Sequence, residues 1–178
     1  MIALVLGGAR SGKSEVAEGM AARLPQPVTY VATAFVGGGS SDREDPDLIL
    51  RVAAHRARRP ATWRTVEPDP GSDLAGVTGR LTGTVLVDSL GMWLAAGDEQ
   101  AGDGDRLCRE LVARPGDTVV VSDEVGLGVH PSSASGLVFR DALGELNRRV
   151  AAVADDVVLV VAGRVLPLQA APDRPGGG

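Results

Sequence analysis

The chain has 178 residues, of which 44% are hydrophobic, 23% are charged and only 3% are aromatic. This composition is typical of a globular protein with a sizeable core, which must here consist mostly of Val, Leu and Ala. The net charge of −5 argues against non-specific binding to nucleic acid or to an anionic membrane. Cys108 is the single cysteine, which excludes an internal disulfide and a cysteine-based metal site.

Hydropathy and the two ends of the sequence predict a cytoplasmic protein of one domain. The longest apolar stretches, such as residues 157–162, are too short to cross a bilayer. Residues 1–6 lack the basic segment and the cleavage site of a signal peptide. We therefore expect one domain over residues 1–170 and a disordered tail over residues 171–178.

Short β-branched runs alternate along the chain with segments of helical periodicity. The runs predict buried strands, apolar on both faces, over residues 2–6, 28–32, 84–87, 118–121 and 157–161. The helical patterns cover residues 14–24, 46–58, 105–113 and 137–153. Glycine-rich residues 37–42 and 97–104 are typical of loops. This alternation predicts an α/β fold with a mainly parallel central sheet flanked by helices.

Residues 7–14 lie between the first predicted strand and the first predicted helix. Their sequence matches G-x-x-x-x-G-K-[ST], the P-loop that binds the phosphates of a nucleoside triphosphate, in the setting that the motif requires. Lys13 would act in catalysis by reaching the β- and γ-phosphates, and Ser14 would give its hydroxyl to Mg²⁺. We therefore assign nucleotide binding to Gly7, Gly8, Ala9, Arg10, Ser11, Gly12, Lys13 and Ser14.

Lys13 is the single lysine among 18 basic residues, and all the others are Arg. A guanidinium is planar and bulkier than an ammonium group, so it does not replace the lysine of a P-loop. We take this as the reason why one lysine is kept. Because there is no second lysine, the chain also lacks the Asn-Lys-x-Asp motif with which switch-type GTPases read guanine.

Acidic residues follow two of the predicted strands. Asp88 ends the run over residues 84–87, and Asp123 and Glu124 end the run that begins at Thr118. In a parallel sheet these ends lie at the same edge as the P-loop, so they are candidate Mg²⁺ ligands together with Ser14. Each acid alone is equally typical of a helix N-cap or of a loop. We expect at least one of Asp88 and Asp123 to serve the metal.

His55 stands out because Arg56, Arg58 and Arg59 follow it directly. A basic cluster at the end of a helix is commonly no more than a favourable match to the helix dipole. In a protein that binds triphosphates, the guanidinium groups can also hold phosphate oxygens and disfavour protonation of the imidazole. A neutral histidine can attack phosphorus and form a covalent intermediate. His130, in a loop before a proline, receives no role.

Several segments together resemble one enzyme family. They are residues 6–14 and 30–34, His-Arg-Ala-Arg-Arg-Pro at 55–60, Trp-Arg-Thr-Val-Glu at 63–67, residues 85–88 and Asp-Glu-Val-Gly-Leu-Gly at 123–128. In that order they are similar to the bifunctional adenosylcobinamide kinase/adenosylcobinamide-phosphate guanylyltransferases of cobalamin biosynthesis. The resemblance covers roughly residues 2–168.

The resemblance implies two reactions and a set of site residues. ATP or GTP would phosphorylate adenosylcobinamide, and GTP would then guanylylate His55, which passes GMP to adenosylcobinamide phosphate. A RecA-like P-loop fold and a homotrimer are implied as well. Beside the P-loop, the residues that fall where the family binds guanine nucleotide are Ala32, Thr33, Ala34, Arg56, Ala57, Arg58, Arg59, Glu67 and Asp88.

The sequence departs from this family pattern in two places. Residues 37–41 lengthen the loop before the histidine helix, and Ser89 and Gly91 stand where Cys and Thr are usual. The motifs for nucleotide chemistry can still be recognised despite these changes. The changes concern the contacts with the corrinoid. The alternative is a monofunctional P-loop kinase of another small metabolite, in which His55 is structural.

Overall fold

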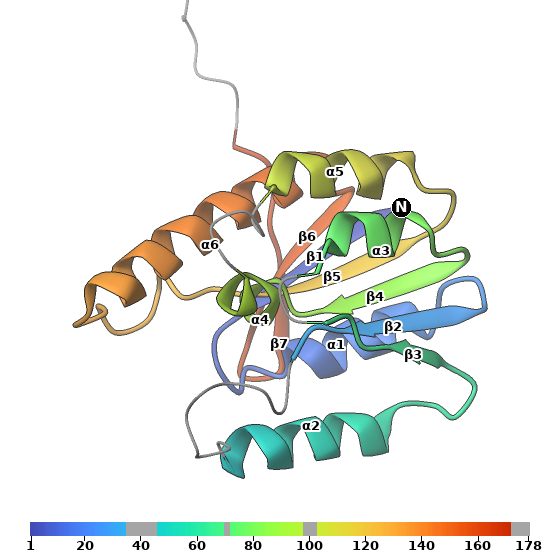
Figure 1. Cartoon of the computed structure of the whole chain (residues 1–178), viewed down its shortest axis with the longest axis horizontal. Helices are drawn as coiled ribbons and strands as arrows, with labels where there is room; N and C mark the ends of the chain where they lie inside the picture. The colour runs from blue at the N-terminus through green and yellow to red at the C-terminus, as the bar shows by residue number, and fades with distance from the viewer. Residues whose placement is uncertain (35–45, 70–71, 98–102, 172–178) are drawn as a thin grey trace, which may run out of the picture.

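The computed structural model describes residues 1–34, 46–69, 72–97 and 103–171, without the side chains of residues 46–49 and 51. Seven strands of this part of the chain form one sheet in the order β3-β2-β4-β5-β1-β6-β7 (Figure 1). β6 and β7 pair antiparallel, and all other neighbours pair parallel. The strands are β1 (Ile2–Gly7), β2 (Val28–Ala32), β3 (Arg64–Val66), β4 (Thr84–Asp88), β5 (Thr118–Asp123), β6 (Asp156–Val161) and β7 (Arg164–Pro167).

Helices cover both faces of the sheet (Figure 1). One face carries α3 (Leu74–Gly79), α4 (Leu90–Ala96), α5 (Gly104–Ala113) and α6 (Ala134–Val153), whose apolar side chains form one core cluster with the sheet. The other face carries α1 (Lys13–Ala21), which packs into a second cluster. α2 (Pro46–Arg58) lies on this side of the molecule, near β3.

The central strands are apolar on both faces because they separate these two clusters. Along β1, Leu4 belongs to the cluster under α3–α6, whereas Ala3 and Val5 belong to the cluster under α1. The same alternation of sides occurs along β4, where Val85 and Leu86 face opposite clusters. Burial on both sides is the reason that parallel strands have continuous hydrophobic sequences. The α/β fold expected from the sequence is therefore confirmed.

The expected elements match the structure except at their ends and in four short pieces. The helix predicted over residues 14–24 ends at Ala21, and the one predicted from residue 137 begins at Ala134, after the N-cap Ser133. The sequence analysis missed β3, β7, α3 and α4, none longer than seven residues. The predicted loop at 37–42, part of that at 97–104 and residues 172–178 of the tail lie outside the described residues.

The carboxyl ends of β1, β4 and β5 meet at one edge of the sheet. Gly7, where the P-loop begins, pairs with Asp123 at the end of β5, and Asp88 ends β4 on the far side of β5. The functional residues predicted from separate segments are therefore brought together, as expected for a parallel α/β sheet. In the part of the chain that the structure describes, no helix combines the length and apolar character needed to cross a membrane.

Candidate active site

A cavity at this edge of the sheet brings together the P-loop, the end of α2 and the ends of β4 and β5. Tyr30, Val52, Ser89 and Met92 are part of its wall. Ten of the residues predicted from the sequence also line it: Lys13, Ser14, Ala32, Ala34, His55, Arg56, Arg59, Glu67, Asp88 and Asp123. The two chemistries that the sequence suggested separately, at Lys13 and at His55, therefore share one space.

The P-loop begins at Gly7, the last residue of β1, which is closely packed. A Cβ atom on Gly7 would overlap the Ser11 side chain and lie 2.9 Å from the Val160 carbonyl oxygen, so only glycine fits there. Gly12 has φ 91°, a left-handed conformation that favours glycine, and caps α1. α1 starts at Lys13, so the first-turn N–H groups of the helix point toward the cavity edge where a phosphate would bind.

Lys13 is directed back across the loop toward the end of β5. Its Nζ lies 2.8 Å from Asp123 Oδ1 and donates to the Gly8 carbonyl oxygen at 3.3 Å. Asp123 can approach this closely because residue 91 is a glycine, where a Cβ would lie 2.5 Å from Asp123 Oδ2. Gly91, where the chain departs from the family pattern, therefore lies next to Asp123, the acid that contacts Lys13.

Asp88 lies on the other side of the cavity, beside the histidine. Its Oδ2 accepts a 2.6 Å hydrogen bond from the Tyr30 hydroxyl and lies 3.7 Å from His55 Nδ1. Glu18 Oε1, on α1, is 3.9 Å from the same ring nitrogen. The imidazole therefore faces two carboxylates in addition to arginine, which the sequence analysis did not anticipate.

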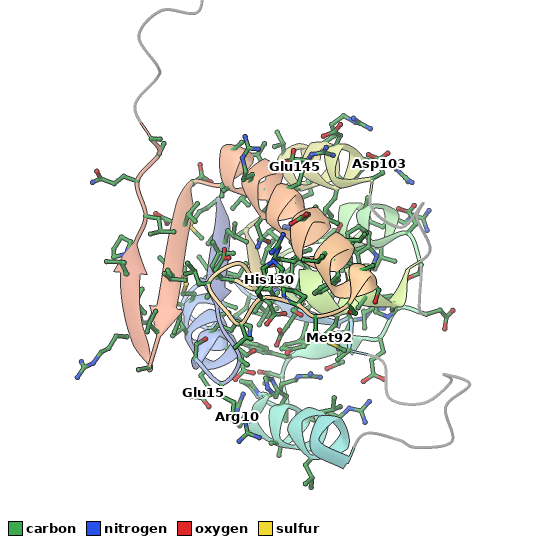
Figure 2. The ribbon with its side chains drawn as sticks, turned by 90° about the vertical axis from the view of Figure 1, so that its left-hand side faces the viewer. Arg10, Glu15, Met92, Asp103, His130 and Glu145 are labelled. Carbon is green, nitrogen blue, oxygen red and sulfur yellow. The ribbon has the colours of Figure 1, made fainter. Side chains whose placement is uncertain are left out.

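The arginines that follow His55 bind different partners. Arg56 pairs with Glu67 at 2.5 Å, and Arg58 pairs with Glu15 at 3.1 Å and lies 3.4 Å from His55 Nδ1. Arg59 lies over the ring of Tyr30 at 3.5 Å, and its Nε has no hydrogen-bond partner among the described residues. Figure 2 shows Glu15 on the side of α1 next to α2, so these contacts join the two helices. Together they fix the last turn of α2.

The remaining predicted residues lie at other places around the P-loop. Gly8, Ala9, Arg10 and Ser11 line a neighbouring cavity, which shares Met92 and Asp123 with the first. The Thr33 hydroxyl donates to the Ser89 carbonyl oxygen at 2.6 Å and accepts from the Ser89 N–H at 2.7 Å, so it ties the end of β2 to the turn after β4. Gly7, Gly12, Thr33, Ala57, Arg58 and Glu124 are not in the wall of the first cavity.

Two residues of this arrangement were missed by sequence reasoning. Tyr30 was read as part of a buried strand, and Glu18 as part of an amphipathic helix. Tyr30 pairs with Leu86 across β2 and β4, so Asp88 is its diagonal neighbour on the same face. Knowledge of the strand order would have found Tyr30, because the diagonal partner of a strand-end acid can be read from the register. Glu18 is placed only by tertiary packing.

The oxygen ligands at the cavity fit a magnesium ion. Ser14 offers a hydroxyl, and Asp88 and Asp123 offer carboxylates from the same wall. Mg²⁺ usually takes only one or two carboxylates and completes its shell with phosphate oxygens and water. In the described residues no group of three or more His, Cys, Asp and Glu side chains forms a metal site.

The fold and the P-loop at its edge define a nucleotide-binding P-loop domain of the RecA-like class. A solved protein from Pyrococcus horikoshii OT3 shares this fold with a TM-score of 0.53 at 8% identity, over 93% of this chain and 84% of that one. An ATPase of a type III secretion system shares it with a TM-score of 0.51 at 10% identity, over 89% and 50%. At such low identity the likeness concerns the fold alone.

The family is shown by closer relatives. Residues 3–168 match the model of the cobinamide kinase / cobinamide phosphate guanyltransferase family, to which the chain therefore belongs. It is 40% identical to the bifunctional adenosylcobalamin biosynthesis protein CobP of Pseudomonas aeruginosa, over 95% of this chain and 98% of the relative. It is 36% identical to the bifunctional protein CobU of Salmonella typhimurium, over 92% and 97%. The resemblance seen in the sequence is confirmed, and the chain is a kinase and guanylyltransferase of adenosylcobalamin biosynthesis.

Proposed function

We propose that this one cavity carries out both reactions, with Lys13 serving the kinase step and His55 serving the guanylyl transfer. The observation that supports this most directly is that Lys13, His55, Asp88 and Asp123 line the same space. A triphosphate bound at the P-loop extends between these groups. The adenosylcobinamide and its phosphate then meet the nucleotide at one site.

In the kinase step, the P-loop holds ATP or GTP by its phosphates. The hydroxyl oxygen of the acceptor forms a bond to the γ-phosphorus, the bond from that phosphorus to the bridging oxygen breaks, and the proton of the hydroxyl passes to water. Lys13, a compact charge at the P-loop, neutralises the charge that the departing β-phosphate gains. Mg²⁺, held by Ser14 together with Asp123 or Asp88, would supply further charge neutralisation when bound.

In the guanylyl step, a lone pair of the neutral His55 ring forms a bond to the α-phosphorus of GTP. The bond between that phosphorus and the oxygen leading to the β-phosphate breaks, and pyrophosphate leaves with the electron pair. An oxygen of adenosylcobinamide phosphate then attacks the same phosphorus. The phosphorus–nitrogen bond breaks, and its electron pair returns to the ring.

The carboxylates beside His55 suit this chemistry. We take Nε2 as the attacking atom, because the two carboxylates of Asp88 and Glu18 face Nδ1 and favour a proton there, against the single guanidinium of Arg58 at 3.4 Å from the same nitrogen. Attack by Nε2 leaves a positive charge on the ring, and two carboxylates within 4 Å stabilise that charge. Arg56 and Arg59, also in the cavity wall, are placed to hold phosphate oxygens.

A covalent-labelling experiment tests the role of His55. With α-labelled GTP, the enzyme should gain an acid-labile, alkali-stable label, as expected of a phosphoramidate. His55→Ala should abolish the label and leave part of the γ-phosphoryl transfer. His130→Ala, which removes an exposed loop histidine whose hydrogen bond is to the Pro131 carbonyl oxygen, is the matched control and should label normally. Labelling of His55→Ala at the rate of the unaltered enzyme would refute the assignment.

We also propose a homo-oligomer, a trimer as the family resemblance implies. Val161, Val165, Leu166 and Leu168, on β6, β7 and just after, are exposed by 39–57% at the outer edge of the sheet. An edge strand with exposed apolar side chains supports a subunit contact there. Light scattering after size exclusion measures the number of subunits, and a monomer at micromolar concentration would overturn this proposal.

A further inference from the structure

The described side chains of the helix that carries His55 contact the protein through polar groups of its last turn. None of them belongs to either apolar core cluster. These contacts are the pair of Arg56 with Glu67 and the pairs of Arg58 with Glu15 and Glu18, and Arg59, just after the helix, contacts Tyr30. They are the described contacts closest in sequence to His55, and they hold the end of the helix that carries it.

Tyr30 differs from the other residues that contact the end of α2, because it contacts both Arg59 and the carboxylate of Asp88. The face of its ring receives the guanidinium of Arg59 at 3.5 Å, one residue beyond the end of α2. Its hydroxyl donates to Asp88 Oδ2 at 2.6 Å, at the end of β4. The ring itself is 1% exposed on β2, so it has a fixed place in the core. One rigid side chain thus joins the helix of His55 to the strand of Asp88.

The hydroxyl gives this link a direction, because it is the donor and the carboxylate of Asp88 is the acceptor. The hydrogen bond occupies Oδ2, the oxygen that faces His55 Nδ1 at 3.7 Å, and so fixes its direction.

We propose that Tyr30 is a positioning residue for guanylyl transfer, which sets the distance and orientation between Asp88 and His55. The inference rests on the proposed role of His55 and deepens it. Loss of the hydroxyl would let the carboxylate of Asp88 rotate away from the ring nitrogen whose charge it stabilises. Lys13 itself does not depend on this link, because it contacts Asp123 and Gly8 instead.

Tyr30→Phe tests this directly, because it keeps the ring and the stacking of Arg59 and removes only the hydrogen bond to Asp88. The rate of label transfer from α-labelled GTP to the enzyme in a single turnover should fall about 10- to 100-fold, the size expected when a reacting group is misplaced by about 1 Å. The dissociation constant of GTP should change less than about twofold, and the rate of γ-phosphoryl transfer should fall less than the rate of labelling, since a positioning role affects the chemical step and not uniform binding.

A double-mutant cycle separates positioning from general damage. Asp88→Asn alone should slow labelling, and Tyr30→Phe should add no further loss in the Asp88→Asn background, because the hydroxyl acts through that carboxylate. Thr84→Val is the matched control: it removes a buried hydroxyl that donates to the Pro25 carbonyl oxygen at 2.6 Å, at the opposite end of β4. It should leave labelling unchanged.

Three outcomes would overturn the inference. The first is labelling of Tyr30→Phe at the normal rate, and the second is an equal loss of labelling in Thr84→Val. The third is a double variant that labels more slowly than Asp88→Asn by the same factor that Tyr30→Phe alone causes. Failure of the proposed function is a different result, namely an unaltered enzyme that takes no label or a label that survives His55→Ala.

Discussion

Lys13 is the residue whose chemical type can be explained most directly. Its Nζ is 2.8 Å from Asp123 Oδ1, and its side chain is only 13% exposed at the base of the P-loop. An ammonium group has three donors on a thin stem, so it can contact a carboxylate, a carbonyl oxygen and a phosphate at once. A guanidinium presents its donors in a flat, wider fork, which needs more space than this site between β1 and β5 provides.

Lys13→Arg should therefore damage the enzyme although it conserves charge. We expect γ-phosphoryl transfer to fall by about 100-fold or more, the loss typical when a charge-stabilising donor leaves its place. The measurement is transfer from γ-labelled ATP to cobinamide. Arg148→Lys, on an exposed stretch of α6 where the side chain is 82% exposed, makes the reverse exchange as a control and should be neutral. Full activity of Lys13→Arg would contradict this explanation of the lone lysine.

At the level of single residues, the sequence identified groups whose chemistry follows from a local pattern. The P-loop, the strand-end acids and His55 all belong to short contiguous motifs, and the structure brings them into one cavity. Tyr30 and Glu18 could not be found in this way. Their roles depend on which strand lies beside β2 and on how α1 faces α2, and neither is encoded in a local spacing.

Among the elements, length and burial decided what could be predicted. The long α6 and the buried central strands carry periodic or continuous apolar patterns, because they pack on one or both core clusters. β3 and β7 lie at the two edges of the sheet and are mostly exposed, so their sequences lack that pattern. α3 contains Gly76 and Gly79, whose low helix propensity conceals it, and its helical start depends on a cap.

That cap is Asp73, which provides a prediction for stability. Its carboxylate accepts from the Gly76 N–H at 3.0 Å and from Arg106 at 2.6 Å. The Gly76 hydrogen bond and, to a lesser degree, Arg106 lower the pKa of Asp73. Asp73→Ala should reduce the free energy of unfolding by about 1 kcal/mol at neutral pH, as for other N-caps. Urea denaturation followed by circular dichroism measures this value.

The pH dependence of this effect has a defined sign. Because the pKa is lower in the folded state, the carboxylate contributes its stability above its unfolded value, and this is lost as pH falls through the folded value. The difference between the unaltered enzyme and Asp73→Ala should therefore shrink on acidification. Asp141→Asn removes an exposed carboxylate that pairs with its neighbour Arg140 and serves as the control. An equal difference at neutral and acid pH would exclude the charge of Asp73 as the cause.

For the whole molecule, the two faces of the sheet differ in the size of the core cluster that they carry. The face with α3–α6 holds the larger core cluster, and the face with α1 carries the smaller cluster and, beyond it, α2 (Figure 1). The cavity lies at the edge where both sides meet. Asp123 and Tyr30 belong to the sheet, whereas His55 belongs to a helix whose described side chains lie outside both core clusters. In the proposed mechanism, the histidine that alternately binds and releases GMP is therefore carried by an element outside the sheet.

We expect the large acceptor to approach along the second cavity. It is bounded by P-loop residues 8–11 and by residues 123–125 and 127–129, and it shares Asp123 and Met92 with the first cavity. Leu127 and Val129 are 77% and 96% exposed beside it, which is a costly arrangement for a free surface. The acceptor hydroxyl must reach the γ-phosphate at the P-loop, and the rest of a corrinoid is large and amphipathic. This apolar rim is therefore expected to contact the corrinoid.

Leu127→Ser tests this arrangement by kinetics with both substrates varied. Covering a leucine side chain contributes about 1.5–3 kcal/mol, so the KM for cobinamide should rise about 10-fold or more, while the KM for GTP and the guanylylation of His55 stay unchanged. Val112→Ser, at a valine of α5 that is 61% exposed and lies outside both cavities, should affect neither constant. An equal rise of both KM values would mean that Leu127 shapes the P-loop. An unchanged KM for cobinamide would place the corrinoid on another face.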